Sequence, residues 1–136
     1  MNVLRTIVCV EDDPDIRTII ELSLSHVGGY EVHIFEDGPT ALLEIDKVSP
    51  DLIILDVMMP GMDGFETLSY LRRMSKTEET PVIFMTAKAQ KREIQRYISA
   101  GAIDVIIKPF DPMTLSGEVQ RIFDQWLLAP AVQTVG

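Results

Sequence analysis

The residues best suited to chemistry are three acids, a threonine and a lysine, each directly after a short apolar run. Glu11 and Asp12 follow the first run. The later runs are followed by Asp56, Thr86 and Lys108. Clustered carboxylates repel one another unless a counter-ion is present, and oxygen ligands favour magnesium or manganese over zinc. A carboxylate is also a nucleophile towards phosphorus. A lysine and a hydroxyl nearby would neutralise and orient phosphoryl oxygens. The set therefore predicts a phosphoryl-transfer site with an acidic acceptor.

The apolar runs that precede these residues predict strands of a parallel sheet. They are short and rich in β-branched residues, and four of the five are nearly unbroken, as in strands buried on both faces. The runs cover residues 6–10, 30–35, 52–55, 82–85 and 105–107. In an open parallel sheet the ligand crevice lies beyond the carboxyl ends of the strands. That topology would bring the chemically suited residues to one edge.

The segments between the runs have helical periodicity. They are marked by Ile16, Ile19, Ile20, Leu22 and Leu24; Leu42, Leu43 and Ile45; Phe65, Leu68 and Leu71; Ile94, Tyr97 and Ile98; and Leu115, Val119, Ile122, Phe123, Trp126 and Leu127. Strand and helix alternate five times, which predicts a doubly wound α/β sheet with right-handed crossovers. We expect one domain over residues 1–128 and a flexible tail or linker stub over 129–136.

The composition excludes several classes of function. The chain has 136 residues and a formal net charge of −9, so nucleic acid and anionic membrane surfaces would repel it. No stretch reaches the roughly 18 apolar residues of a membrane helix, and no signal peptide is visible. The single cysteine, Cys9, lies in an apolar run and excludes an internal disulfide. We expect a soluble, cytoplasmic protein.

Four motifs resemble response-regulator receiver domains of two-component signalling, and chemotaxis regulators in particular. They are Ile-Val-Cys-Val-Glu-Asp-Asp-Pro-Asp at 7–15, Asp-Val-Met-Met-Pro-Gly-Met-Asp-Gly at 56–64, Met-Thr-Ala at 85–87 and Lys-Pro-Phe at 108–110. The resemblance covers about residues 5–127. It implies a flavodoxin-like fold with strand order 2-1-3-4-5 and helices on both faces.

The resemblance also implies a role for each matching residue at the metal site. Asp56 would accept a phosphoryl group from a phosphohistidine of a sensor histidine kinase or a histidine phosphotransfer protein. Asp12 and Asp56 would bind Mg²⁺ through their carboxylates and Met58 through its backbone carbonyl, and Mn²⁺ could substitute. Glu11, where the family most often has Asp, would reach the ion through a water.

Further implications concern how the signal is passed on. Thr86 would donate a hydrogen bond to a phosphoryl oxygen, and Lys108 would pair with phosphoryl and carboxylate. The Lys108–Pro109 peptide bond is expected to be cis. Val105 departs from the pattern, because the family often places Tyr or Phe three residues before the lysine. We therefore expect phosphorylation to shift the loop 86–90 rather than the side chain of Val105.

Other readings of single residues are ordinary structural roles. Asp13 could bind metal, but we expect it to cap the helix that begins at Pro14. Met58, Met59 and Met62 could suggest a soft-metal site, but they lack Cys or His partners, and we expect them to fill gaps or to act through the backbone. His26 and His33 are expected away from the acidic residues.

Two rival functions stay open on the sequence alone. One is a receiver-like scaffold that binds partners without phosphorylation, against which Asp56, Thr86 and Lys108 argue. The other is a magnesium-dependent hydrolase, which would need a general acid near Asp56, where Met58 stands. We expect a signalling domain that acts on a downstream effector protein or a tethered output domain, and not an enzyme in the ordinary sense. The sequence leaves open whether it stands alone.

Overall fold

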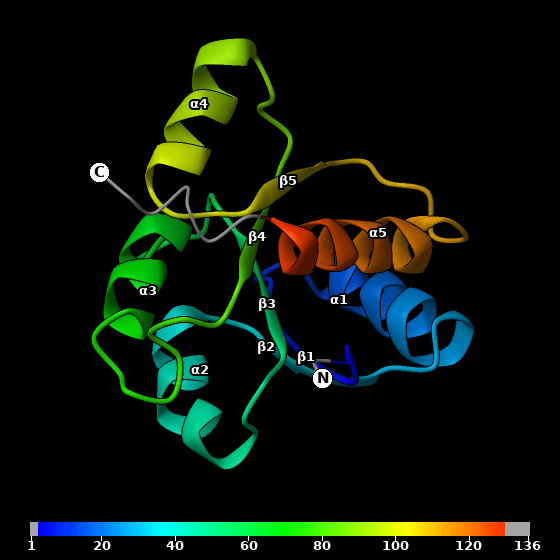
Figure 1. Cartoon of the computed structure of the whole chain (residues 1–136), viewed down its shortest axis with the longest axis horizontal. Helices are drawn as coiled ribbons and strands as arrows, with labels where there is room; N and C mark the ends of the chain where they lie inside the picture. Colours follow the sequence, from blue (N-terminus) through cyan, green and yellow to red (C-terminus); the bar gives the residue numbers. More distant parts are fainter. Residues whose placement is uncertain (1–2, 130–136) are drawn as a thin grey trace.

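The computed structural model, which describes residues 3–129, is a parallel sheet between two layers of helices (Figure 1). The five strands are β1 (Thr6–Val10), β2 (Glu31–Phe35), β3 (Leu52–Asp56), β4 (Val82–Thr86) and β5 (Asp104–Ile107). They lie in the order β2-β1-β3-β4-β5, and every neighbouring pair is parallel. The predicted flavodoxin-like fold is confirmed.

Helices cover both faces of the sheet (Figure 1). They are α1 (Pro14–Ile20), the π-helix η1 (Glu21–Val27), α2 (Gly38–Glu44), the 3₁₀ helix η2 (Ile45–Lys47), α3 (Gly64–Leu71), α4 (Lys91–Ser99) and α5 (Leu115–Leu128). Residues of α1, η1 and α5 share one apolar cluster with the sheet. Residues of α2, α3 and α4 share the other. Among the helices of residues 3–129, none has the length and apolar character needed to cross a membrane.

Alternation along the strands explains the two clusters. In β1, Ile7 and Cys9 belong to the cluster under α1 and α5, whereas Val8 and Val10 belong to the opposite cluster. Successive side chains of a strand point to opposite faces, so an unbroken apolar strand supplies both. The predicted burial on both faces holds for β1, β3 and β4. It is wrong for β5, an edge strand whose Ile107 is 50% exposed.

The first helix differs from its predicted apolar stripe. Ile20 and Leu24 are buried, but Ile19 and Leu22 are 37% and 52% exposed. The buried pair is spaced i, i+4, which keeps both side chains on one face of a helix, and Ile19 and Leu22 lie outside that face. The α-helix ends at Ile20 and the chain continues as η1.

The start of α1 bears out the capping role predicted for Asp13. Its carboxylate accepts hydrogen bonds from the backbone N–H groups of Asp15 and Ile16, at 2.8 and 3.4 Å. These are orphan donors of the first helical turn, so Asp13 is engaged as an N-cap. At the other end of the chain α5 ends at Leu128. Of the predicted tail at 129–136, residues 130–136 lie outside the described residues.

The sheet register brings the predicted site residues to one edge. Asp56 pairs with Met85 on β4, and Thr86 pairs with Ile107 on β5. The Lys108 N–H donates to the Thr86 carbonyl at 2.8 Å, which continues the ladder past the end of β5. The ends of β3 and β4 and the residue after β5 are therefore neighbours.

Gly64, the first residue of α3, lets that helix begin against the end of β3. A Cβ atom at this position would lie 2.5 Å from the carbonyl oxygen of Asp56, closer than van der Waals contact allows. Because the clashing atom belongs to the backbone, a larger residue would have to displace the strand end. The glycine thus keeps α3 close to Asp56.

Candidate functional site

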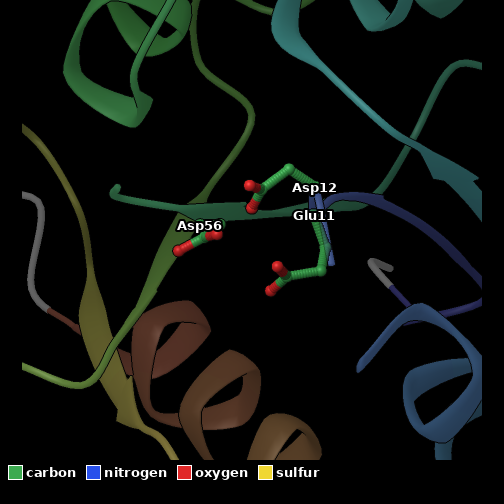
Figure 2. A group of neighbouring side chains, drawn as sticks. All are labelled: Glu11, Asp12 and Asp56. Atoms are coloured by element: carbon green, nitrogen blue, oxygen red, sulfur yellow. The ribbon is translucent and has the colours of Figure 1, made fainter. Parts of the chain in front are cut away.

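Three carboxylates converge at the carboxyl edge of the sheet. Glu11 and Asp12 follow β1, and Asp56 is the last residue of β3. Figure 2 shows the three side chains gathered at this edge, and their nearest oxygen atoms all lie within 4.8 Å of one another. Glu11 and Asp56 are 1% and 4% exposed, whereas Asp12 reaches solvent. Such closely spaced acids repel one another when ionised, which either raises the pKa of one of them or favours a positive charge beside them.

Lys108 provides part of that charge. Its Nζ lies 2.7 Å from Oε1 of Glu11 and 3.2 Å from Oδ1 of Asp56. One ammonium against three carboxylates leaves a formal charge of −2 when all three are ionised. Oxygen ligands in this number with an excess of negative charge suit a hard divalent cation.

Glu11 provides a test of whether a cation fits. Its Oε2 accepts a hydrogen bond from the Asp13 N–H at 3.1 Å. Its Oε1 is buried and pairs with the Lys108 ammonium, which occupies one of its two lone pairs. A buried carboxylate oxygen with spare acceptor capacity is what a metal-bound water would satisfy. The donor set therefore fits Mg²⁺.

The titration of Asp56 reflects this crowding. Burial, followed by repulsion from Glu11, raises the pKa of Asp56 from 3.8 to about 7, although the Lys108 ammonium acts in the opposite direction. Burial tends to lower the pKa of Lys108, but its contacts with Glu11 and Asp56 outweigh this effect and the pKa is raised. Lys108 therefore remains a cation, and Asp56 is the acid whose charge depends on what binds nearby.

This shift predicts a pH dependence of stability for the metal-free protein. A carboxyl whose folded pKa exceeds its unfolded pKa stabilises the fold fully below about pH 4 and loses that contribution as pH rises through about 7. Asp56→Asn cannot ionise. We therefore compare the free energy of unfolding of the variant with that of the wild type. The difference, variant minus wild type, should become more positive by about 1–3 kcal/mol between pH 5 and pH 8. Urea unfolding in the presence of a chelator measures this, and parallel pH profiles would contradict it.

Thr86 and Met58 are the remaining predicted site residues. Thr86, at the end of β4, is 2% exposed. Its Oγ1 accepts a hydrogen bond from the Lys88 N–H at 3.0 Å. Met58 follows Asp56 by two residues and exposes 59% of its surface, which argues against gap filling and leaves the backbone role as the remaining expectation. The Lys108–Pro109 bond is cis, as the resemblance implies.

Two further side chains, neither assigned to the site from the sequence pattern, contact residues of this region. The Arg17 guanidinium donates to the backbone carbonyls of Glu11 and Asp12, at 2.9 and 2.8 Å, and so fixes the acidic turn after β1. The Tyr97 hydroxyl lies 3.5 Å from Oγ1 of Thr86. Arg17 could have been suspected, because it lies in the short helix that directly follows the acidic residues. Tyr97 looked like a simple core position of a helix.

Comparisons with known proteins show the family to which the chain belongs. The family model of the response regulator receiver domain matches residues 7–120. The transcriptional regulatory protein AfsQ1 of Streptomyces coelicolor is 35% identical over 88% of this chain. The chain spans 51% of the length of that relative.

Solved structures give the same result. The chemotaxis protein CheY4 of Vibrio cholerae is 34% identical with a TM-score of 0.81, over 88% of this chain and 99% of that one. The receiver domain of the sensor histidine kinase PA1611 from Pseudomonas aeruginosa is 30% identical with a TM-score of 0.77, over 93% and 100%. That structure has a magnesium ion coordinated in its active-site cleft. The chain belongs to the response-regulator family and is a receiver domain of phosphorylation-activated, two-component signalling.

Proposed function

We propose that Asp56 is the phosphoryl acceptor of this receiver, and that its donor is a phosphohistidine of a histidine kinase or a histidine phosphotransfer protein. The observation that carries the proposal is the Lys108 ammonium held between Asp56 and Glu11, with Asp12 in the same cluster. A nucleophilic carboxylate, a fixed cation and two further acids are the parts that phosphoryl transfer to an aspartate requires.

Magnesium would be held by the carboxylates of Asp12 and Asp56 and the backbone carbonyl of Met58, with Glu11 acting through a water. When bound, the ion neutralises the acids and the phosphoryl oxygens. Manganese, with similar ligand preferences, could replace it. The spare acceptor capacity of Oε1 of Glu11 supports this assignment.

The chain's own groups account for the rest of the reaction. A carboxylate oxygen of Asp56 attacks phosphorus, the phosphorus–nitrogen bond of the phosphohistidine breaks, and the histidine keeps the electron pair. Lys108 pairs with the phosphoryl oxygens, and the Thr86 hydroxyl donates a hydrogen bond to one of them. The reaction modifies the chain itself, so we propose that this is not an enzyme acting on a separate substrate.

Phosphorylation would then alter the affinity of the domain for a downstream effector protein or a tethered output domain. Response regulators receive phosphate from histidine kinases and act on output domains or effectors. The net charge of −9 disfavours direct nucleic-acid binding by the domain. The cytoplasmic location expected from the sequence stays a prediction.

The metal ligands have unequal expected effects. We expect roughly sub-millimolar to millimolar magnesium affinity, because few direct ligands are available beside retained waters. Asp12→Ala should lose both magnesium binding and phosphoryl uptake, whereas Glu11→Ala, which removes a water-mediated ligand, should weaken binding less. Titration with magnesium, followed by intact-mass measurement after treatment with acetyl phosphate, tests both variants. Wild-type magnesium affinity in Asp12→Ala would require the site to be reassigned.

A further inference from the structure

We propose that Tyr97, on α4, is the side chain that couples the hydrogen bonding of Thr86 to the loop 87–90 and to α4. This inference rests on the proposed function in one respect, namely that a phosphoryl group on Asp56 attracts the Thr86 hydroxyl. The residues that carry the coupling are Thr86 at the end of β4, Lys88 in the loop and Tyr97 in the helix. Tyr97 is a positioning residue, and we infer no contact between it and the phosphoryl group.

Three contacts join these residues into a closed ring. The Lys88 N–H donates to Oγ1 of Thr86 at 3.0 Å. The Tyr97 hydroxyl donates to the Lys88 carbonyl at 3.0 Å. The oxygens of Thr86 and Tyr97 lie 3.5 Å apart and close the ring. The end of β4, the loop and α4 are thereby linked through polar atoms at a buried position.

The number of hydroxyl protons shows which group donates in the contact between Thr86 and Tyr97. A tyrosine hydroxyl has one proton, and that of Tyr97 is used by the Lys88 carbonyl. The contact at 3.5 Å must therefore use the single hydroxyl proton of Thr86. At this length the hydrogen bond is weak. A charged phosphoryl oxygen is a far stronger acceptor than a phenol oxygen, so it would take this proton away from Tyr97.

The packing around Tyr97 would transmit the loss of the contact with Thr86 to the loop 87–90 and to α4. Tyr97 is 3% exposed, and its ring centroid lies 5.7 Å from that of Phe84 and 5.8 Å from that of Phe65. A ring held between β4 and α3 in this way ties α4 to the sheet. Val105 faces Phe84 across the strands and packs in the same cluster, but its side chain has no polar atom. Tyr97, and not Val105, brings a hydroxyl to Thr86.

Tyr97 also forms part of the wall of a groove beside α4. With Met58, Lys88 and Arg96 it lines a groove of about 480 Å³ between the segment after β3 and α4. A shift of the loop and of the first turn of α4 would change the shape of this groove. The inference therefore places the response to phosphorylation at the β4–α4 connection.

Tyr97→Phe tests the contribution of the hydroxyl alone, because phenylalanine keeps the aromatic packing. Tyr70→Phe is the matched control, since Tyr70 lies on α3 and is 45% exposed. Amide exchange across residues 86–99 is measured for both variants and the wild type, with magnesium alone and with magnesium plus beryllium fluoride as phosphoryl mimic. Intact mass after acetyl phosphate reports uptake at Asp56 separately.

We expect Tyr97→Phe to take up the phosphoryl group like the wild type, while the change in amide exchange caused by the mimic falls about two-fold or more. Without the mimic, amides 87–90 should exchange faster than in Tyr70→Phe, because the Lys88 carbonyl loses its donor. An unchanged response in Tyr97→Phe would overturn the inference and leave the proposed function intact. A wild type without uptake would overturn the proposed function instead. In that case the amide exchange of residues 87–90 without the mimic tests the coupling. Equal rates in Tyr97→Phe and Tyr70→Phe would overturn the coupling as well.

Discussion

Thr86→Ala is expected to accept a phosphoryl group at Asp56 but to lose most of the conformational response that follows. A ligand shifts a two-state equilibrium only through contacts that differ between the states, and the Thr86 hydroxyl supplies one of them. A hydrogen bond to a charged group is worth about 1.5–3 kcal/mol, so its loss should reduce the shift about ten-fold or more. Uptake depends chiefly on Asp56, the metal ligands and Lys108, which the substitution leaves in place.

Val105→Ala is the matched control on the neighbouring strand. It removes apolar side-chain atoms that pack in the same cluster as Tyr97, at a cost of about 1–3 kcal/mol in stability. Its response should change little, because no polar contact is lost. Amide exchange across residues 86–107, with and without a phosphoryl mimic, compares the two variants. A response that survived Thr86→Ala but vanished in a folded Val105→Ala would contradict this view of the switch.

The residue pattern alone was sufficient to predict a parallel sheet and the closeness of Asp56 to Lys108. Unbroken apolar runs followed by single polar residues indicate buried parallel strands, and parallel strands place their carboxyl ends together. The position of Asp56 and Lys108 at the ends of apolar runs was therefore enough to predict that both lie at the same edge of the sheet. Asp13 was predicted as a cap because it directly precedes Pro14, and a local signal of this kind does not depend on distant contacts.

The features that escaped prediction depend on where side chains point in three dimensions. Arg17 reaches back to two backbone carbonyls, and Tyr97 meets Thr86 across a loop. Helical periodicity identifies Tyr97 as a core residue, but does not reveal which polar atom its hydroxyl meets. The exposure of Ile107 follows from the place of β5 at the edge of the sheet, which its apolar sequence does not indicate.

Asp56→Asn is expected to have the largest effect on function, because it removes the proposed nucleophile. Asn keeps a similar shape, so Glu11 and Lys108 should remain paired and the variant should stay folded. Asp63→Asn is the matched control, since Asp63 caps α3 in the segment that follows Asp56 and asparagine also caps helices.

The measurement that tests the central claim most directly is intact mass after incubation with acetyl phosphate and magnesium. The wild type and Asp63→Asn should each gain the mass of one phosphoryl group, and Asp56→Asn should gain none. Peptide mapping should locate the added mass at Asp56. Undiminished labelling of Asp56→Asn, or a wild type that gains no mass while binding magnesium, would contradict the assignment of Asp56 as the acceptor.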